Sequence, residues 1–169
     1  LRFHEINARS QQESVGVVGV NLIYGAFYQH DRPRKMLRYL FDHIDKTAIE
    51  IDTINFTGPL FDDIDNRILS LELVKNGMTE AVMFSPDGNN LLPARVLYKK
   101  NILAIRGSFR PVTNVNMDMF ISSSEMFYKD KDVKEENTMT IFEITLSNLM
   151  ANSTGFIDCL LYTSPSPRD

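Results

Sequence analysis

The amino-acid sequence predicts an α/β fold in which helices pack on a largely parallel sheet. Short segments with period-two alternation, or with a continuous apolar run, alternate with segments whose apolar residues recur at helical spacing. This alternation favours parallel strands joined by helices. The 169 residues are 43% hydrophobic and 24% charged, which suffices for one sizeable core. We therefore expect a single α/β domain segment over residues 1–158, truncated at both ends.

Two helices are expected in the opening part of the chain, after a short strand. Residues 1–6 alternate apolar and polar side chains, which predicts the strand. Ser10–Glu13 has the form of a capping box, so we expect a helix over about residues 11–29. Asp31 is expected to cap a second helix that has Pro33 in its first turn.

The middle of the chain is expected to hold two strands with a helix between them. Residues 48–56 are rich in isoleucine with period-two alternation, and residues 79–84 are expected to form a short strand closed by a turn at 86–88. Between the two runs, apolar residues at i, i+4 and i+7 predict a helix that ends near Gly77. These residues are Ile64, Ile68 and Leu71.

One further strand and two long helices are expected in the second half. After a brief helical piece near 92–98, residues 101–105 are almost continuously apolar, which is typical of a strand buried on both faces. Helices are expected over about 114–128 and 138–151, separated by a charged connector in solvent. Five methionines in these patterns are expected to fill the core: Met117, Met119, Met126, Met139 and Met150.

Residues 159–169 are expected to lie outside the fold. One set of codons for them reads TGT CTC TTA TAC ACA TCT and onward, which looks like a transposase-derived sequencing adapter read through in frame. Such a segment is excluded from fold reasoning. The alternative is a natural flexible tail rich in proline and serine. We expect disorder there, and we draw nothing from Cys159, the single cysteine of the chain.

Charge and hydropathy restrict the partners that the chain can have. A net charge of −4 and a pI near 5.4 give no basic surplus for a nucleic-acid backbone. No apolar run approaches the roughly 18 residues that a membrane-spanning helix needs, and the N-terminus does not resemble a signal peptide. We therefore expect no nucleic-acid partner, no membrane partner and a cytoplasmic location.

Three loops that follow predicted strands could carry chemistry. They span residues 57–67, 85–90 and 106–113, and they would converge at one edge if their strands were parallel neighbours. The third loop contains the components of an anion site: two arginines, a glycine, two hydroxyls and a helix start just beyond. The predicted ligand-binding residues are Arg106, Gly107, Ser108, Arg110 and Thr113. Alternatively, Arg106 and Arg110 pair with the acidic loop at residues 57–67 and only tie two connections together.

Asp62 and Asp65 could hold a divalent cation beside that anion. They stand three residues apart at an expected helix start, and Mg²⁺ often bridges one or two carboxylates to a phosphate. The alternative is that these aspartates cap the helix and complement its dipole. The three histidines lack the spacing of a zinc site.

Parts of the chain resemble a family of much longer bacterial proteins that automatic labels often name nicotinate-nucleotide adenylyltransferase or TonB-dependent receptor. The resemblance lies in residues 58–67, which read GPLFDDIDNR, in 97–100, LYKK, and in 106–113, RGSFRPVT. It extends from Leu1 to about Asp158 and implies a middle segment of a longer protein. These motifs imply no catalytic residue, and the H-x-G-H-like motif of common nucleotide adenylyltransferases is missing from the sequence.

Two functions from different classes follow from these observations. The first is a segment of an enzyme that binds a small phosphorylated or nucleotide ligand, with nucleotidyl or phosphoryl transfer as the reaction class and Mg²⁺ as the cofactor. The second is a non-catalytic scaffold or regulatory interaction module of a larger cytoplasmic protein. The sequence does not indicate the substrate, the catalytic residues or the oligomeric state.

Overall fold

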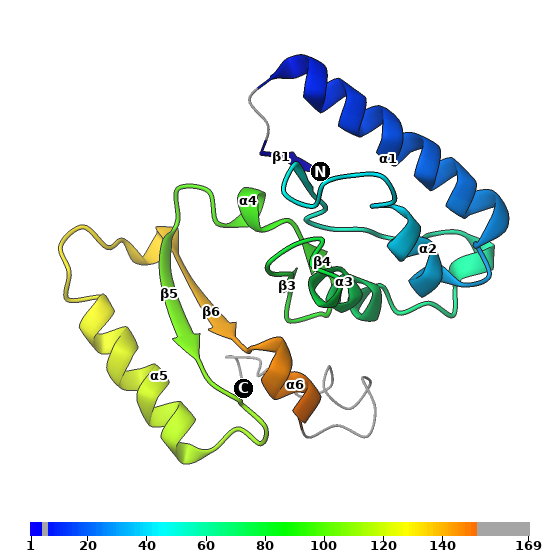
Figure 1. Ribbon diagram of the computed structural model, residues 1–169. Helices are drawn as coiled ribbons and strands as arrows, with labels where there is room; N and C mark the ends of the chain where they lie inside the picture. The colour runs from blue at the N-terminus through cyan, green and yellow to red at the C-terminus, as the bar shows by residue number, and fades with distance from the viewer. Residues whose placement is uncertain (5–6, 152–169) are drawn as a thin grey trace. The chain divides into compact units, whose positions relative to one another are not determined.

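The computed structural model describes residues 1–4 and 7–151, which form two compact units (Figure 1). Among the described residues, the first unit contains those of 1–84 together with 89–92, and the second contains 85–88 together with 93–151. Both units combine helices with short strands, so the mixed α/β content predicted from the sequence is present. The predicted adapter segment, 159–169, lies outside the described residues.

The described part of the first unit contains three helices and four short strands. The helices are α1 (Ala8–Tyr28), α2 (Pro33–Tyr39) and α3 (Asn66–Lys75), and the first strand is β1 (Arg2–Phe3). The other strands have two residues each: β2 (Ile49–Glu50), β3 (Met83–Phe84) and β4 (Asn90–Leu91). A 3₁₀ turn, η1, spans Pro59–Phe61. Strand β1 pairs antiparallel with β2, and β3 pairs antiparallel with β4.

The core of the first unit lies between its helices and the extended chain around β2. Leu37, Ile49 and Leu73 have no exposed surface, so one residue each from α2, β2 and α3 meets at its centre. Gly77 has a φ of 68° just beyond α3, as expected for a glycine that ends a helix. The other buried members of this core are Val18, Met36, Leu40, Phe41, Ile51, Phe56, Leu69 and Met78.

The second unit is built around a parallel strand pair. Strand β5, Asn101–Arg106, and strand β6, Thr138–Glu143, pair along their full lengths, with Asn101 opposite Thr138 and Arg106 opposite Glu143. Helix α5, Asn114–Phe127, connects them, and the ring of Phe120 lies 5.8 Å from that of Phe142. The unit also contains two short helices, α4 (Pro93–Val96) and α6 (Leu146–Ala151). Its 3₁₀ turn, η2, spans Glu135–Asn137.

The strand pairing agrees with the predicted parallel sheet in only one of the three strand pairs of the described residues. Among the described residues, β1–β2 and β3–β4 are antiparallel, and only β5–β6 is parallel. Strands β2, β3 and β5, which precede the three candidate loops, belong to three different two-stranded sheets. The condition under which those loops would converge, that their strands be parallel neighbours, is therefore not met.

The predicted helix over 138–151 is wrong in its first half. Residues 138–143 form strand β6, and the helix is limited to α6. The segment reads TMTIFE, and its two threonines, isoleucine and phenylalanine have high strand propensity. Pairing with β5 satisfies the backbone groups of this segment, and that pairing is not visible in its local apolar pattern.

Two predicted helix caps and the predicted role of the methionines are also wrong. Asn7 caps α1 by accepting a hydrogen bond from the Arg9 backbone, and Ser10 lies inside the helix. Arg32, without a side-chain cap bond, precedes α2, so Asp31 does not cap it.

Four of the five methionines predicted to fill the core are more than a third exposed: Met117, Met119, Met126 and Met150.

Candidate functional site

The predicted anion loop lies where a parallel strand leads into a helix. β5 ends at Arg106, the loop follows, and α5 begins at Asn114. Arg106 is paired in register with Glu143, the last residue of β6, so the loop stands at the carboxyl end of the parallel pair. Ligands of α/β proteins bind at such ends, and this placement was correctly predicted from the sequence.

Arg106 forms an ion pair within the second unit. Its Nη2 lies 2.6 Å from Oε1 of Glu143, with 69% and 45% of the two side chains exposed. The alternative expected for this arginine was an ion pair with the acidic loop at residues 57–67, whereas the partner that it has is Glu143 at the end of β6. An exposed pair of this kind contributes about 0–1 kcal/mol, so it is too weak to hold the guanidinium permanently away from a competing anion.

Gly107 makes room for an aromatic ring of its own chain. A Cβ placed on Gly107 would lie 3.0 Å from Cζ of Phe109 and within 3.3 Å of two further atoms of that ring. Phe109 is 3% exposed, has a φ of 48° and packs edge-on against Phe142 at 5.2 Å. The space beside the Gly107 backbone, which the sequence analysis assigned to a ligand, is occupied by the Phe109 ring.

Arg110 and Thr113 of the loop also have roles in the fold. Nη1 of Arg110 donates to the backbone carbonyl of Leu149 at 3.4 Å, and the bond from Arg110 to Pro111 is cis. Thr113 caps α5 in a capping box with Asn116, whose Oδ1 accepts from the Thr113 backbone at 2.9 Å. Ser108 is exposed beside them.

Asp65 is a helix cap and the partner of a nearby arginine. Its Oδ1 accepts a hydrogen bond from the Arg67 backbone at 2.9 Å, and its Oδ2 lies 2.7 Å from Nη2 of Arg67. The hydrogen bond from the Arg67 side chain is the largest effect on this carboxyl and, despite partial burial, its pKa lies below the ordinary value. The capping alternative is therefore confirmed for Asp65.

Asp62 lies at the end of η1 with an exposed side chain. Asp62 and Asp65 belong to the first unit, whereas the predicted anion loop belongs to the second. Within residues 1–4 and 7–151, no three carboxylate, imidazole or thiol groups gather in a way that could hold a metal ion.

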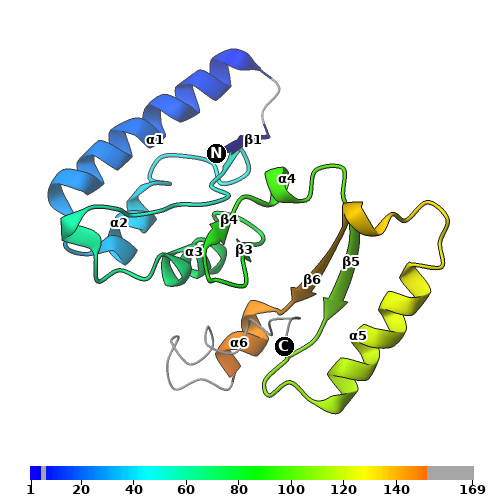
Figure 2. The ribbon, with the colours of Figure 1, turned by 180° about the vertical axis from the view of Figure 1, so that it is seen from behind.

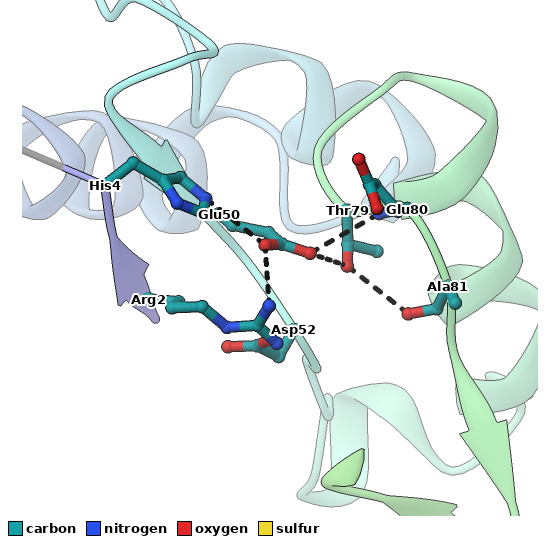
Figure 3. Close-up of polar contacts among 7 residues, drawn as sticks. All are labelled: Arg2, His4, Glu50, Asp52, Thr79, Glu80 and Ala81. Carbon is teal, nitrogen blue, oxygen red and sulfur yellow. Dashed lines mark hydrogen bonds and ion pairs between the residues drawn. The ribbon is translucent and has the colours of Figure 1, made fainter. Parts of the chain in front are cut away.

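A polar network in the first unit was not identified from the sequence (Figure 3). Glu50 of β2 is its centre, with 12% of its side chain exposed. Its carboxylate lies 3.1 Å from Nη1 of Arg2 and 3.3 Å from Nε2 of His4, and it accepts from the hydroxyl of Thr79 at 2.5 Å. Arg2 also contacts Asp52 through its second terminal nitrogen.

The electrostatics of this network keep Glu50 ionised. Burial alone would raise the pKa of this carboxyl, but hydrogen bonds from Thr79 and Glu80 and the charge of Arg2 outweigh burial and lower it. Asp52 is 6% exposed and faces the same guanidinium. Arg2 therefore compensates two buried carboxylates, and the network fixes β1 and the segment around Thr79 to β2.

The residues of this network are far apart in the sequence. Arg2, Glu50 and Thr79 come from β1, β2 and the segment after α3, so no short motif contains them. A sequence signal was present only in the alternation of β1, which places Arg2 and His4 on the same side of the strand. The network joins β1, β2 and the segment after α3 within the first unit.

Within the described residues, no helix has both the length and the hydropathy that a membrane crossing requires. Comparison of the chain with family models, with curated proteins and with solved structures gives no match.

Proposed function

We propose that this chain is a non-catalytic interaction module of a larger cytoplasmic protein, and that α5 carries the contact. The observation that supports the proposal is the exposure of this helix: none of its 14 residues is buried. Two rows of apolar side chains, which we call the flanks of α5, run along the helix, and both rows are exposed to solvent. One consists of Val115, Met119 and Met126, and the other of Met117 and Ile121.

The arrangement of these flanks suits a helix packed between two neighbours. Asp118 and Glu125 form an exposed acidic ridge between the flanks, while Phe120 faces β6. Exposed apolar patches commonly mark contact surfaces, and methionine adapts to irregular partners. A partner on each side of α5 would bury both flanks and leave the ridge in water.

The strand pair beneath α5 supports the same proposal. An isolated two-stranded sheet is marginally stable, and parallel strands are normally covered on both faces. In β5, Ile102 is 37% exposed, and Ala104 is also exposed. We propose that β5 and β6 belong to a larger, largely parallel sheet whose other strands are supplied by the rest of the larger protein.

Oxidation of methionine by hydrogen peroxide tests this function. In the purified chain, Met117, Met119 and Met126 are expected to oxidise rapidly because they are 46%, 38% and 72% exposed. In a lysate of the cells that naturally make the protein, the same three residues are expected to oxidise several-fold more slowly. Peptide mass spectrometry measures both rates.

Two buried methionines of the first unit serve as internal controls in that experiment. Met36 and Met78 are 4% and 3% exposed, so both should oxidise slowly in either sample. Equal rates for the α5 methionines in the purified chain and in the lysate would contradict the proposed contact.

A second candidate function is binding of a small phosphorylated or nucleotide ligand at the loop after β5. It is favoured by one observation, the position of Arg106 and Thr113 at the carboxyl end of the β5–β6 pair. A phosphate would replace the weak exposed contact with Glu143 by charge-assisted hydrogen bonds to the guanidinium. Arg110 and Ser108 would supply further donors. Nucleotidyl or phosphoryl transfer, with Mg²⁺, is the reaction class proposed for such a site.

Thermal shift with inorganic phosphate, nucleoside triphosphates and sugar phosphates, each with and without Mg²⁺, tests the second candidate. A ligand at a hundred times its dissociation constant should add about 2.7 kcal/mol of stability. The Arg106→Gln variant should lose this gain. Arg9→Gln, which removes an arginine with 86% of its side chain exposed on α1, should keep it. The absence of a shift with every probe would contradict the anion site.

A further inference from the structure

Helix α1 has an outward face of unusual composition. Residues at successive spacings of four, three and four define this face, which we name the α1 seam: Gly16, Val20, Ile23 and Phe27. Val20, Ile23 and Phe27 are 65%, 61% and 75% exposed, and a Cβ on Gly16 would meet nothing within 4 Å. α1 lies along the outer side of its unit in both views (Figure 1, Figure 2).

The opposite side of α1 already packs against its own unit. Val18 and Gly25 are buried, and a Cβ on Gly25 would lie 2.7 Å from Cγ of Met36 in α2. From Ser14 to Gln29 the sequence has no charged residue. A surface helix normally places charges opposite its buried face, and a helix that is apolar all round is normally covered on all sides. The α1 seam therefore lacks a partner in this unit.

The distribution of side-chain size along the seam indicates the orientation of that partner. The small residue Gly16 stands near one end and the large Phe27 near the other, about 16 Å apart along the axis. Two seams that pair antiparallel place Phe27 of each copy on Gly16 of the other, and Val20 on Ile23. Two parallel seams would set glycine against glycine and phenylalanine against phenylalanine, leaving a gap at one end and crowding at the other.

We infer that the α1 seam is a self-association surface, on which a second copy of this chain packs antiparallel about a two-fold axis between Val20 and Ile23. A two-fold axis requires that one patch be complementary to itself, and this seam meets that requirement by size. The inference concerns the first unit and does not depend on the role proposed for α5.

Charge complementarity at the two ends of α1 supports the same occupant. Arg9 and Glu13 form an ion pair of 3.0 Å before the seam, and Asp31 and Arg32 form one of 3.3 Å after it. Each of these doublets holds one acid and one base, and antiparallel pairing brings the end of α1 that bears Arg9 and Glu13 toward the end that precedes Asp31 and Arg32. The seam residues themselves are uncharged, although the chain carries −4, so two copies meet there without repulsion between seam charges.

The size of the seam determines how strong the association should be. Stable interfaces bury about 800 Å² on each partner, whereas a single helix of 21 residues, about 32 Å long, offers one narrow face. We therefore expect a reversible dimer whose population rises with concentration.

Sedimentation of the purified chain over a concentration series tests this inference. Ile23→Lys places two ammonium groups beside the two-fold axis and should raise the dimer dissociation constant at least tenfold. Leu60→Lys introduces the same charge at a side chain of the first unit that is 78% exposed and lies outside both proposed contact surfaces, and it should leave that constant within twofold. A chain that remains monomeric at every concentration would overturn the inference, as would weakening by Leu60→Lys alone.

Disulfide cross-linking tests the orientation without relying on a charged variant. Gly16→Cys and Phe27→Cys are made separately, each together with Cys159→Ser, and the two proteins are mixed and oxidised. Antiparallel seams bring residues 16 and 27 of different copies together, so cross-linked heterodimers should predominate. A parallel pair would give only homodimers, because unlike positions would be too far apart for a disulfide. Predominant homodimers, or no cross-link, would overturn the antiparallel seam.

Discussion

The variant Leu73→Ala is expected to lower the free energy of unfolding of the first unit by about 2–5 kcal/mol. Leu73 has no exposed surface and lies in the core between α3, α2 and β2. The loss combines the transfer energy of the deleted methyl and methylene groups with the cost of the cavity left behind. Because domains of this size are stable by only about 5–15 kcal/mol, the effect is a large fraction of the total.

Hydrogen exchange in a series of urea concentrations measures this loss for each unit separately. The matched control is Leu60→Ala, which deletes the same atoms from a side chain that is 78% exposed. The control should change stability by no more than about 0.5 kcal/mol. Equal effects of the two substitutions on the amides of α3 would show that Leu73 does not lie in a packed core.

The variant Glu50→Gln is expected to destabilise the first unit by about 1–3 kcal/mol at neutral pH. The glutamine amide has no charge to compensate Arg2. Its one oxygen can still accept from Thr79 and Glu80, which both donate to Oε1 of Glu50, but an NH2 donor then replaces Oε2 opposite Arg2 and His4. Burial of the site makes each lost partner costly, since a buried donor without an acceptor keeps its full desolvation cost.

The cost of Glu50→Gln is expected to depend on pH with a definite sign. The pKa of Glu50 in the folded chain is lowered from its ordinary value of 4.5, so ionisation of this group favours folding. Its contribution is present above the unfolded-state pKa and is lost as the pH falls through the lower folded-state pKa. The stability difference between the original chain and the variant should therefore shrink below about pH 4.5.

Urea denaturation, monitored by hydrogen exchange at pH 7 and at steps from pH 5 to pH 3, measures how the cost of Glu50→Gln depends on pH. Glu13→Gln provides the control, because Glu13 pairs with Arg9 on the exposed side of α1 and has 65% of its side chain exposed. The control should change stability little at any of these pH values. A Glu50→Gln cost that stays constant down to pH 3 would contradict the role assigned to the ionised carboxylate.

The candidate site illustrates how far residue types alone can predict function. Arg106 and Thr113 were correctly placed at the end of a parallel strand and at a helix start. Their partners could not be predicted, because an arginine fork and a hydroxyl suit a phosphate, a carboxylate or a backbone group equally well. In the fold, Asn116 of the same helix start partners Thr113, whereas Glu143, the partner of Arg106, is brought there by β6, which lies later in the chain.

The sequence by itself determined the features whose energy is local. Helix α5, the strand beginning at Asn101 and the turn at Gly77 agree with their apolar periods and end signals, because capping bonds and backbone preferences act within a few residues. It also determined the mixed helix and strand content.

Only the tertiary structure decided which strands pair, whether residues 138–143 are strand or helix, and which charges meet around Glu50. Each of these depends on contacts between residues tens of positions apart, such as Arg2 with Glu50 and Arg106 with Glu143. A local pattern does not contain the energy of such contacts, because strand pairing and burial outweigh the small propensity differences of a short segment. The same reason explains the exposed methionines of α5: helical spacing identifies an apolar face, whereas burial requires a partner.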